Sequence, residues 1–154
     1  MPDLLAEWRE EERKKSKTLA YRTIGCAMKV YSKLGPGLLE SVYQKAMLIE
    51  LDNQGIEAES EVPIDVTYDG VDLGLGFRMD IVVEDILVLE LKSVSAFESI
   101  HYKQLSNYLH LTNLPLGYLI NFNVDDFVVG KGFEKVKNLR YKGDIPEWLY
   151  YNGE

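Results

Sequence analysis

Two acidic residues and a lysine stand inside otherwise apolar, strand-like runs of the sequence. Asp80 interrupts the run 77–83, and Glu90 and Lys92 lie two residues apart in the run 86–92. Because side chains alternate between the two faces of a strand, Glu90 and Lys92 point to the same face. Charges in such a strand must be paired, bound to a metal or placed at a cleft, because burying them unpaired costs several kcal/mol.

Asp80 and Glu90 are therefore a candidate metal-binding pair. Two carboxylates, with waters and a backbone carbonyl, make the oxygen-rich site that Mg²⁺ or Mn²⁺ prefers. A neighbouring lysine can hold or help deprotonate a water, while the cation lowers the pKa of that water and neutralises charge that develops on a phosphate. This combination is characteristic of phosphodiester hydrolysis. The alternative is an internal ion pair of Lys92 with Asp80 or Glu90 at a sheet edge.

The turn between the two strands decides whether the pair can form. A regular two-residue hairpin at Glu84-Asp85 would put Asp80 and Glu90 on opposite faces of the sheet. A three-residue turn or a bulge shifts the register by one and brings Asp80 diagonal to Glu90. We therefore predict such an irregularity between Val82 and Ile86, and a regular two-residue hairpin would count against metal binding.

Apolar residues at helical spacing predict the helices that surround these strands. The predicted helices cover 19–34, 38–53 and 100–111. Gly35-Pro36-Gly37 is a tight corner between the first two, because glycine and proline are stop signals at a helix end. A capping box at 95–98 precedes the third helix. The predicted buried stripe of the second helix consists of Val42, Ala46 and Ile49.

A period of two predicts the strands. Residues 62–68 and 71–73 flank Asp69-Gly70, which is a strong hairpin signal. The later strand candidates are 77–83, 86–92, 116–122 and 127–129. The order of two helices, four strands, a helix and one or two strands predicts an α/β sandwich around a mixed sheet.

Length and composition limit the class of protein. The 154 residues fit one domain, with a charged N-terminal extension at 1–17 and a C-terminal tail at 130–154. One cysteine and two histidines exclude an internal disulfide and argue against a Cys/His zinc cluster. No apolar stretch could span a bilayer and the N-terminus is charged, so we expect a cytoplasmic protein with no membrane contact. The net charge of −8, with 15 acidic and 3 basic residues in 46–126, has the wrong sign for a generic nucleic-acid binder.

Two ordered motifs resemble a known group of enzymes. Asp80 followed by Glu90-Leu91-Lys92 resembles the active-site signature of the PD-(D/E)xK nuclease superfamily. The segment 34–43, with Gly37, Glu40 and Tyr43, resembles the motif of the GxxExxY family within it. Segments 90–94, 100–109 and 117–122 are similar to that family too, so the similarity spans about 20–129. It implies a restriction-endonuclease-like αβββαβ core, a mixed central sheet flanked by helices, and an extra N-terminal helix.

The resemblance also implies roles for five residues. Asp80 and Glu90 would hold Mg²⁺ or Mn²⁺, with Glu40 as an additional acid. Lys92 would position the attacking water, and Gln104 would help orient water or phosphate. Four side chains are candidate substrate contacts, each with packing or ion pairing as the alternative: Tyr43, Arg78, His101 and Tyr108. The chain departs from the family at Tyr31, where histidine is usual, and has Met79 in place of the signature proline.

The predicted function is therefore a metal-dependent nuclease acting on DNA or RNA. A catalytically silent nuclease-fold module for binding or assembly is the alternative, favoured by the acidic net charge and the lack of an obvious basic groove. A hydrolase of small molecules or nucleotides could use the same carboxylates. We also expect a homodimer, because small nuclease domains often pair to reach two strands and the Trp/Tyr-rich tail could supply an interface.

Overall fold

The computed structural model describes residues 1–151, apart from the side chain of Leu75. Within this part, four helices accompany a five-stranded sheet. The helices are α1 Leu4–Ser16, α2 Leu19–Leu34, α3 Glu40–Asn53 and α4 Ser99–Thr112. The strands are β1 Ala58–Tyr68, β2 Val71–Val83, β3 Leu87–Lys92, β4 Leu116–Asn121 and β5 Phe133–Lys137.

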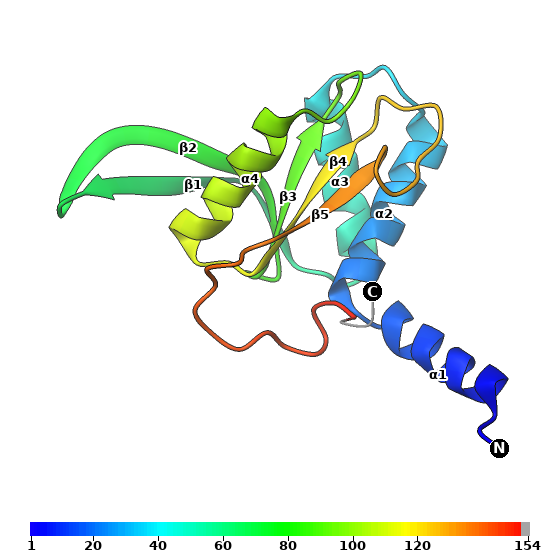
Figure 1. Ribbon diagram of the computed structural model, residues 1–154. Coiled ribbons are helices and arrows are strands. Elements are labelled where there is room, and N and C mark those ends of the chain that lie inside the picture. Colours follow the sequence, from blue (N-terminus) through cyan, green and yellow to red (C-terminus); the bar gives the residue numbers. More distant parts are fainter. Residues whose placement is uncertain (152–154) are drawn as a thin grey trace.

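The sheet is mixed and lies between two helical layers. Its strands follow the order β1-β2-β3-β4-β5, with β3 and β4 parallel and the other neighbours antiparallel. Helices α2 and α3 lie on one side of the sheet, and the crossover helix α4 lies on the other (Figure 1). The predicted core of a helix, three strands, a helix and a strand is therefore confirmed as α3-β1-β2-β3-α4-β4, with α2 as the extra helix.

Alternation along β3 fixes the face on which each side chain lies. Leu87, Leu89 and Leu91 belong to the core that includes α2 and α3, whereas Val88 packs with Leu105 and Leu109 of α4. Because Glu90 and Lys92 are even-numbered like Val88, the pleat directs them to the α4 side. The sheet thus separates the main apolar core from the charged residues.

Strands β1 and β2 form a long hairpin that projects beyond the helices (Figure 1). We call residues 62–79 the arm. Its tip is the predicted two-residue turn, with φ of 50° at Asp69 and 77° at Gly70, as the type I′ turn requires. The prediction of separate strands 71–73 and 77–83 is wrong, because β2 is continuous. The register between the two strands shifts between Asp65 and Thr67, and β2 forms a bulge there that includes Gly74, with a φ of 65°.

The buried face of α3 differs from the prediction. Of the predicted stripe, Ala46 is partly buried against the core, whereas Val42 and Ile49 are exposed. The buried side chains are Tyr43, Met47, Glu50 and Leu51. Tyr43 and Glu50 can be buried because both have polar partners: the Tyr43 hydroxyl bonds to the backbone of the corner, and Glu50 pairs with Lys33 at 2.7 Å. Both the predicted and the observed faces of α3 have helical spacing. The observed face is buried because its polar side chains have partners that are distant in the sequence.

Two boundaries in the second half of the chain also differ from prediction. The capping box of α4 consists of Glu98 and His101, so Glu98 is the N-cap residue, whereas the predicted box 95–98 made it the N3 residue. The predicted strand 127–129 makes only an isolated bridge between Val129 and Phe133, and the last strand is β5. The chain turns before β5, where the amides of Lys131 and Gly132 both donate to the Val128 carbonyl. The ring of Phe127 packs so closely on Gly132 that a Cβ there would lie 2.5 Å from it.

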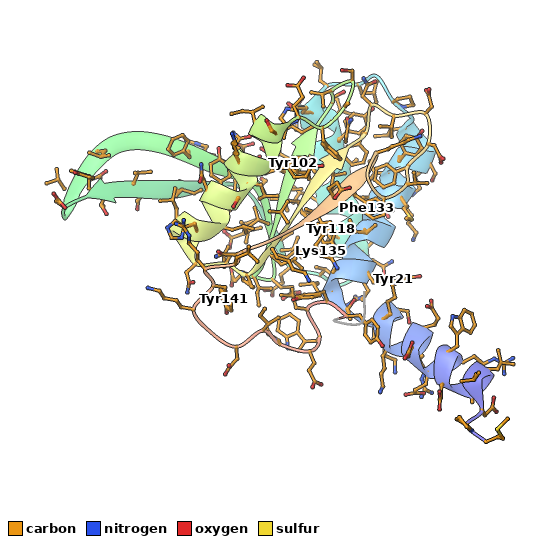
Figure 2. All side chains as sticks on the ribbon, in the orientation of Figure 1. Tyr21, Tyr102, Tyr118, Phe133, Lys135 and Tyr141 are labelled. Carbon is orange, nitrogen blue, oxygen red and sulfur yellow. The ribbon has the colours of Figure 1, made fainter. Side chains whose placement is uncertain are left out.

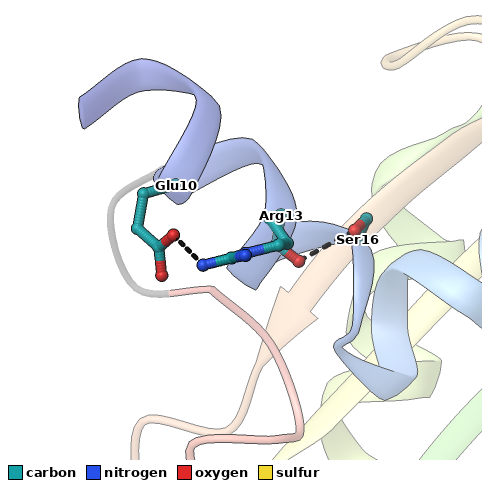
Figure 3. Close-up of polar contacts among 3 residues, drawn as sticks. All are labelled: Glu10, Arg13 and Ser16. Carbon is teal, nitrogen blue, oxygen red and sulfur yellow. Dashed lines mark hydrogen bonds and ion pairs between the residues drawn. The ribbon is translucent and has the colours of Figure 1, made fainter. Parts of the chain in front are cut away.

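The C-terminal tail contacts the start of α2, whereas α1 carries the N-terminus away from the body (Figure 1). Helix α1, which was expected only as a charged extension, projects from the body without a buried residue. It carries an Arg13–Glu10 ion pair, and the Ser16 hydroxyl donates to the Arg13 carbonyl at 2.8 Å (Figure 3). No helix in the part described here is long and apolar enough to cross a membrane.

The C-terminal tail closes over the core of its own chain. Leu149 and Tyr150 are buried, and the amides of Leu19 and Ala20 donate to the carbonyls of Trp148 and Leu149 at 2.7 and 2.9 Å. A cavity of about 400 Å³ lies nearby, lined by aromatic, aliphatic and lysine side chains, most of them from α2, β4, β5 and the tail. Figure 2 marks Tyr21, Tyr118, Phe133 and Lys135 from this lining. Residues 152–154 of the predicted tail lie outside the described residues.

Candidate active site

The turn between β2 and β3 has the irregularity predicted for bringing Asp80 and Glu90 together. Val83 pairs with Leu87, so three residues form the turn. Glu84 and Asp85 both adopt positive φ, at 50° and 56°. The register Ile81 to Leu89 then places Asp80 directly opposite Glu90, not diagonal to it as predicted.

Where β2 and β3 separate, the carboxylates of Asp80 and Glu90 accept the hydrogen bonds that backbone carbonyls would accept in a regular ladder. The paired residues end at Ile81 and Leu89. Beyond them, the Asp80 amide donates to Glu90 Oε1 at 3.2 Å, and the Leu91 amide donates to Asp80 Oδ2 at 2.8 Å. The carboxylates thus accept backbone hydrogen bonds across the gap, which fixes both side chains on the α4 face of the sheet.

Burial and mutual repulsion disfavour the ionised form of both carboxyl groups of this pair. Glu90 is 3% exposed, and burial followed by the charge of Asp80 raises the pKa of Glu90 to about 8. Burial also raises the pKa of Asp80, with smaller contributions from Glu40 and Glu61, against the Leu91 hydrogen bond and Lys92. Two carboxylates in this state hold a proton at neutral pH.

Lys92 continues the site toward α4. Its Nζ donates to Gln104 Oε1 at 3.2 Å, and Gln104 Nε2 donates to the hydroxyl of Tyr108 at 3.0 Å. The structure therefore brings Lys92 and Gln104 together, as expected. Within the described residues Lys92 makes no ion pair with Asp80 or Glu90, so the alternative of an internal pair is not formed.

The corner before α3 is tied down by one buried tyrosine. The Tyr43 hydroxyl donates to the Gly35 carbonyl at 2.6 Å and accepts from the Leu38 amide at 3.1 Å. Gly37 has a φ of 92°, which a residue with a side chain rarely adopts. The Ser93 hydroxyl, just after β3, donates to the Leu38 carbonyl at 3.0 Å. The glycine and tyrosine of the 34–43 segment thus dock the start of α3 beside the end of β3.

This docking places Glu40, the first residue of α3, beside the carboxylate pair. Its charge contributes to the raised pKa of both Asp80 and Glu90. Its side chain is exposed, and no three His, Cys, Asp or Glu side chains in the described chain gather closely enough to hold a metal ion. The structure therefore presents two direct ligand candidates, with Glu40 as a nearby acid.

The candidate substrate contacts occupy different environments. Tyr43 is fully buried and stacks on Phe122 at 4.3 Å between ring centroids, so its expected substrate contact is replaced by a supporting position. His101 Nδ1 accepts from the Glu98 amide at 2.9 Å in the cap of α4. Tyr108 is 6% exposed and reaches the site through Gln104. Arg78 is exposed on the arm.

Tyr31, where the related family usually has histidine, also has a supporting position. Its hydroxyl donates to the Val124 carbonyl at 2.6 Å and its ring stacks on Phe127 at 5.1 Å. Both partners lie in the loop between β4 and β5. Tyr31 therefore anchors that loop to α2.

Sequence reasoning missed two residues that contact the site. Gln44 Nε2 donates to Glu61 Oε1 and to the Asp80 carbonyl, both at 2.9 Å. Gln44 lies one helical turn after Glu40, and this shared polar face was a usable signal. Glu61 gave none, because a polar residue in an alternating strand is ordinary.

The fold and the site together define the class of protein. A family profile described as the PD-(D/E)XK nuclease superfamily matches residues 17–135. This match covers more than half of the chain, so the chain belongs to the PD-(D/E)XK nuclease superfamily. The mixed α/β fold is consistent with the restriction-endonuclease-like core of that superfamily.

None of the curated proteins matches the chain. A solved structure titled "Crystal structure of SSO0001" is similar with a TM-score of 0.48 and 19% identity. The similarity covers 64% of this chain and 50% of that chain, so the present chain aligns with about half the length of the solved one.

The donor set fits the divalent ions that this superfamily generally uses. Asp80 and Glu90 supply only oxygen, and a cation between them would relieve the repulsion by which the charge of Asp80 raises the pKa of Glu90. Mg²⁺ is commonly bound by one or two carboxylates together with waters. These two residues would therefore hold a hard divalent cation.

Proposed function

We propose that the chain is a metal-dependent nuclease that hydrolyses phosphodiester bonds of DNA or RNA. The observation that carries the proposal is the opposed pair of buried carboxylates, Asp80 and Glu90, beside Lys92 in a nuclease fold. We assign the chain within the superfamily to the GxxExxY family, because the positive φ of Gly37, the charge of Glu40 near the carboxylates and the hydrogen bonds of Tyr43 give each motif residue a physical reason.

Each residue has a distinct part in the proposed reaction. Asp80 and Glu90 hold Mg²⁺ or Mn²⁺, which when bound stabilises charge on the phosphate and favours ionisation of the attacking water. Lys92 orients that water through its ammonium group, whose position is fixed by Gln104 Oε1. Gln104 is held in turn by the Tyr108 hydroxyl. Glu40 adds negative charge at the entrance to the cation site.

We also propose that two copies act together. Leu4, Leu5 and Trp8 on the projecting helix α1 are all more than half exposed, and burying such side chains against a second copy would be favourable. Light scattering at micromolar concentration is expected to give twice the mass of 17.6 kDa. A monomer would remove this part of the proposal.

The test combines metal binding with cleavage. Calorimetric titration of Mn²⁺ and incubation with labelled single-stranded, duplex and branched DNA and with RNA are made on each protein. The Asp80→Asn/Glu90→Gln double variant is expected to lose both binding and cleavage. Lys92→Met is expected to keep binding and lose cleavage. Glu59→Gln, which removes an exposed carboxylate on β1, is the matched control and should retain both.

The outcomes separate the two candidate functions. Mn²⁺ binding without cleavage of any of these nucleic acids would point to a different phosphodiester substrate or a missing partner. No Mn²⁺ binding by the unaltered protein would refute the nuclease proposal and support the catalytically silent module, which the net charge of −8 favours.

A further inference from the structure

Both backbone polar groups of Asp80 bond to side chains. Its amide donates to Glu90 Oε1 at 3.2 Å, and its carbonyl accepts from Gln44 Nε2 at 2.9 Å. The carboxylate of the same residue accepts from the Leu91 amide. Three contacts from α3 and β3 therefore fix the place of this residue at the point where β2 leaves β3.

The amide group of Gln44 links three elements at this point. Its Nε2 carries two hydrogens, and it donates to Glu61 Oε1 on β1 and to the Asp80 carbonyl on β2, each at 2.9 Å. A side-chain amide with two acceptors on its nitrogen has its rotamer and its flip determined. The carboxylate of Glu61 therefore orients the Gln44 donor toward Asp80.

The backbone of Glu61 is shaped for this contact. Ser60 pairs with Ile81 and Val62 pairs with Met79, but the intervening pair of Glu61 with Asp80 is missing from the ladder. Glu61 has a φ of 53°, which is uncommon for a residue with a side chain and especially within a strand. Strained backbone of this kind persists only where surrounding contacts hold it in place, and it is concentrated at functional sites.

We infer that Gln44 and Glu61 form a brace that positions Asp80 against Glu90 for cation binding. The inference rests on the proposed function, because it assigns a role toward the cation of that same site. Gln44 is a positioning residue: it acts through the Asp80 carbonyl. Glu61 acts one step further away, by holding the Gln44 amide.

Each substitution in the brace removes a defined hydrogen-bonding group. Gln44→Leu keeps the size of the side chain and removes the donor. Glu61→Gln removes the charge but keeps an oxygen that accepts from Gln44, whereas Glu61→Ala removes both. Comparison of the two Glu61 variants thus separates orientation of Gln44 from simple attraction of a cation by negative charge. Lys45→Ala, an exposed change on the same helix, is the control.

The first readout needs no metal. Amide hydrogen exchange is measured for Asp80 and Leu91, which donate to Glu90 and Asp80. Gln44→Leu and Glu61→Ala are expected to speed exchange of these two amides by about 10-fold or more, because local opening becomes easier. Glu61→Gln and Lys45→Ala should stay within about 3-fold of the unaltered protein. The Val83 amide, at the far end of the β2–β3 ladder, should not change in any variant.

The second readout is Mn²⁺ affinity by calorimetry, with thermal unfolding measured alongside. Gln44→Leu and Glu61→Ala are expected to weaken affinity by about 10-fold, within the range seen when groups that support metal ligands are removed. Glu61→Gln should keep affinity within about 3-fold, which a purely electrostatic role would not allow. Should Gln44→Leu fail to fold, Glu61→Ala on the exposed strand tests the same contact.

The failure of the brace and the failure of the proposed function are distinguishable. Unchanged exchange of Asp80 and Leu91 in both disruptive variants overturns the brace. Equal loss of affinity in Glu61→Gln and Glu61→Ala overturns it too, in favour of charge alone. An unaltered protein that binds no Mn²⁺ refutes the proposed function, and the exchange rates then still decide whether Gln44 positions Asp80.

Discussion

Replacing Glu90 by glutamine should stabilise the cation-free protein, although it removes a proposed ligand. Burial and the charge of Asp80 raise the pKa of Glu90 to about 8, from an ordinary value of 4.5. Between these two pH values the folded protein binds more protons than the unfolded chain. The stability of the unaltered protein therefore falls as pH rises through this window. Glutamine carries no charge at any pH and keeps an oxygen that can accept from the Asp80 amide.

The size of the effect follows from the two pKa values. With about 1.4 kcal/mol for each pH unit above the unfolded value, the penalty at Glu90 is on the order of 1 kcal/mol at pH 5 and about 3 kcal/mol at pH 7. Above the folded pKa it levels off at about 5 kcal/mol. Glu90→Gln should thus raise the free energy of unfolding by amounts that grow in this way with pH.

Urea denaturation followed by circular dichroism, in EDTA at pH 5, 7 and 9, measures these differences. Mg²⁺ should then reverse the order, because a ligand that binds only the folded state stabilises it, and the variant lacks a ligand. A difference between the two proteins that does not depend on pH would refute the reasoning. So would a variant that is less stable than the unaltered protein at pH 9.

Three further substitutions test the supporting structure by urea denaturation or amide exchange. Tyr43→Phe should lower the free energy of unfolding by about 1–3 kcal/mol, because the buried Gly35 carbonyl and Leu38 amide lose their partner; a change below a few tenths would contradict this. Leu89→Ala, at a fully buried position of β3, should cost about 2–5 kcal/mol, and a smaller loss would mean that the core collapses around the gap. Gly70→Ala, at φ 77°, should lower the free energy required to open the arm by about 1–2 kcal/mol. Amide exchange of Tyr68 and Val71 measures this change, and rates equal to those of the unaltered protein would contradict it.

The central part of the site could be predicted because its charges break apolar runs. Asp80, Glu90 and Lys92 are conspicuous in strands of Val, Ile and Leu, and the pleat alone puts two of them on one face. The requirement for a longer turn also followed from register, and the structure confirms it with three turn residues after Val83. These features depend on neighbours in sequence, which a sequence displays.

The remaining features depend on partners distant in sequence. Burial of Tyr43 needs the Gly35 carbonyl and the stacked ring of Phe122, so helical periodicity alone selected the wrong stripe of α3. The link from Gln44 to Glu61 needs a left-handed residue within a strand. The polar face of α3 indicates Gln44, but no local pattern identifies the distant partner in either contact.

The arm has a mechanical consequence for the site at its root. Its tip lies roughly 30 Å along β2 from Asp80, at about 3.3 Å per residue, so a tilt of about 2° at the root moves the tip by about 1 Å. Conversely, a force applied to the tip, where Tyr68 and Val71 are largely exposed, exerts a torque at the root of the arm, where Asp80 lies. If holding the tip strengthens cation binding at Asp80 and Glu90, thermodynamic reciprocity requires that the cation restrict the direction of the arm by the same free energy.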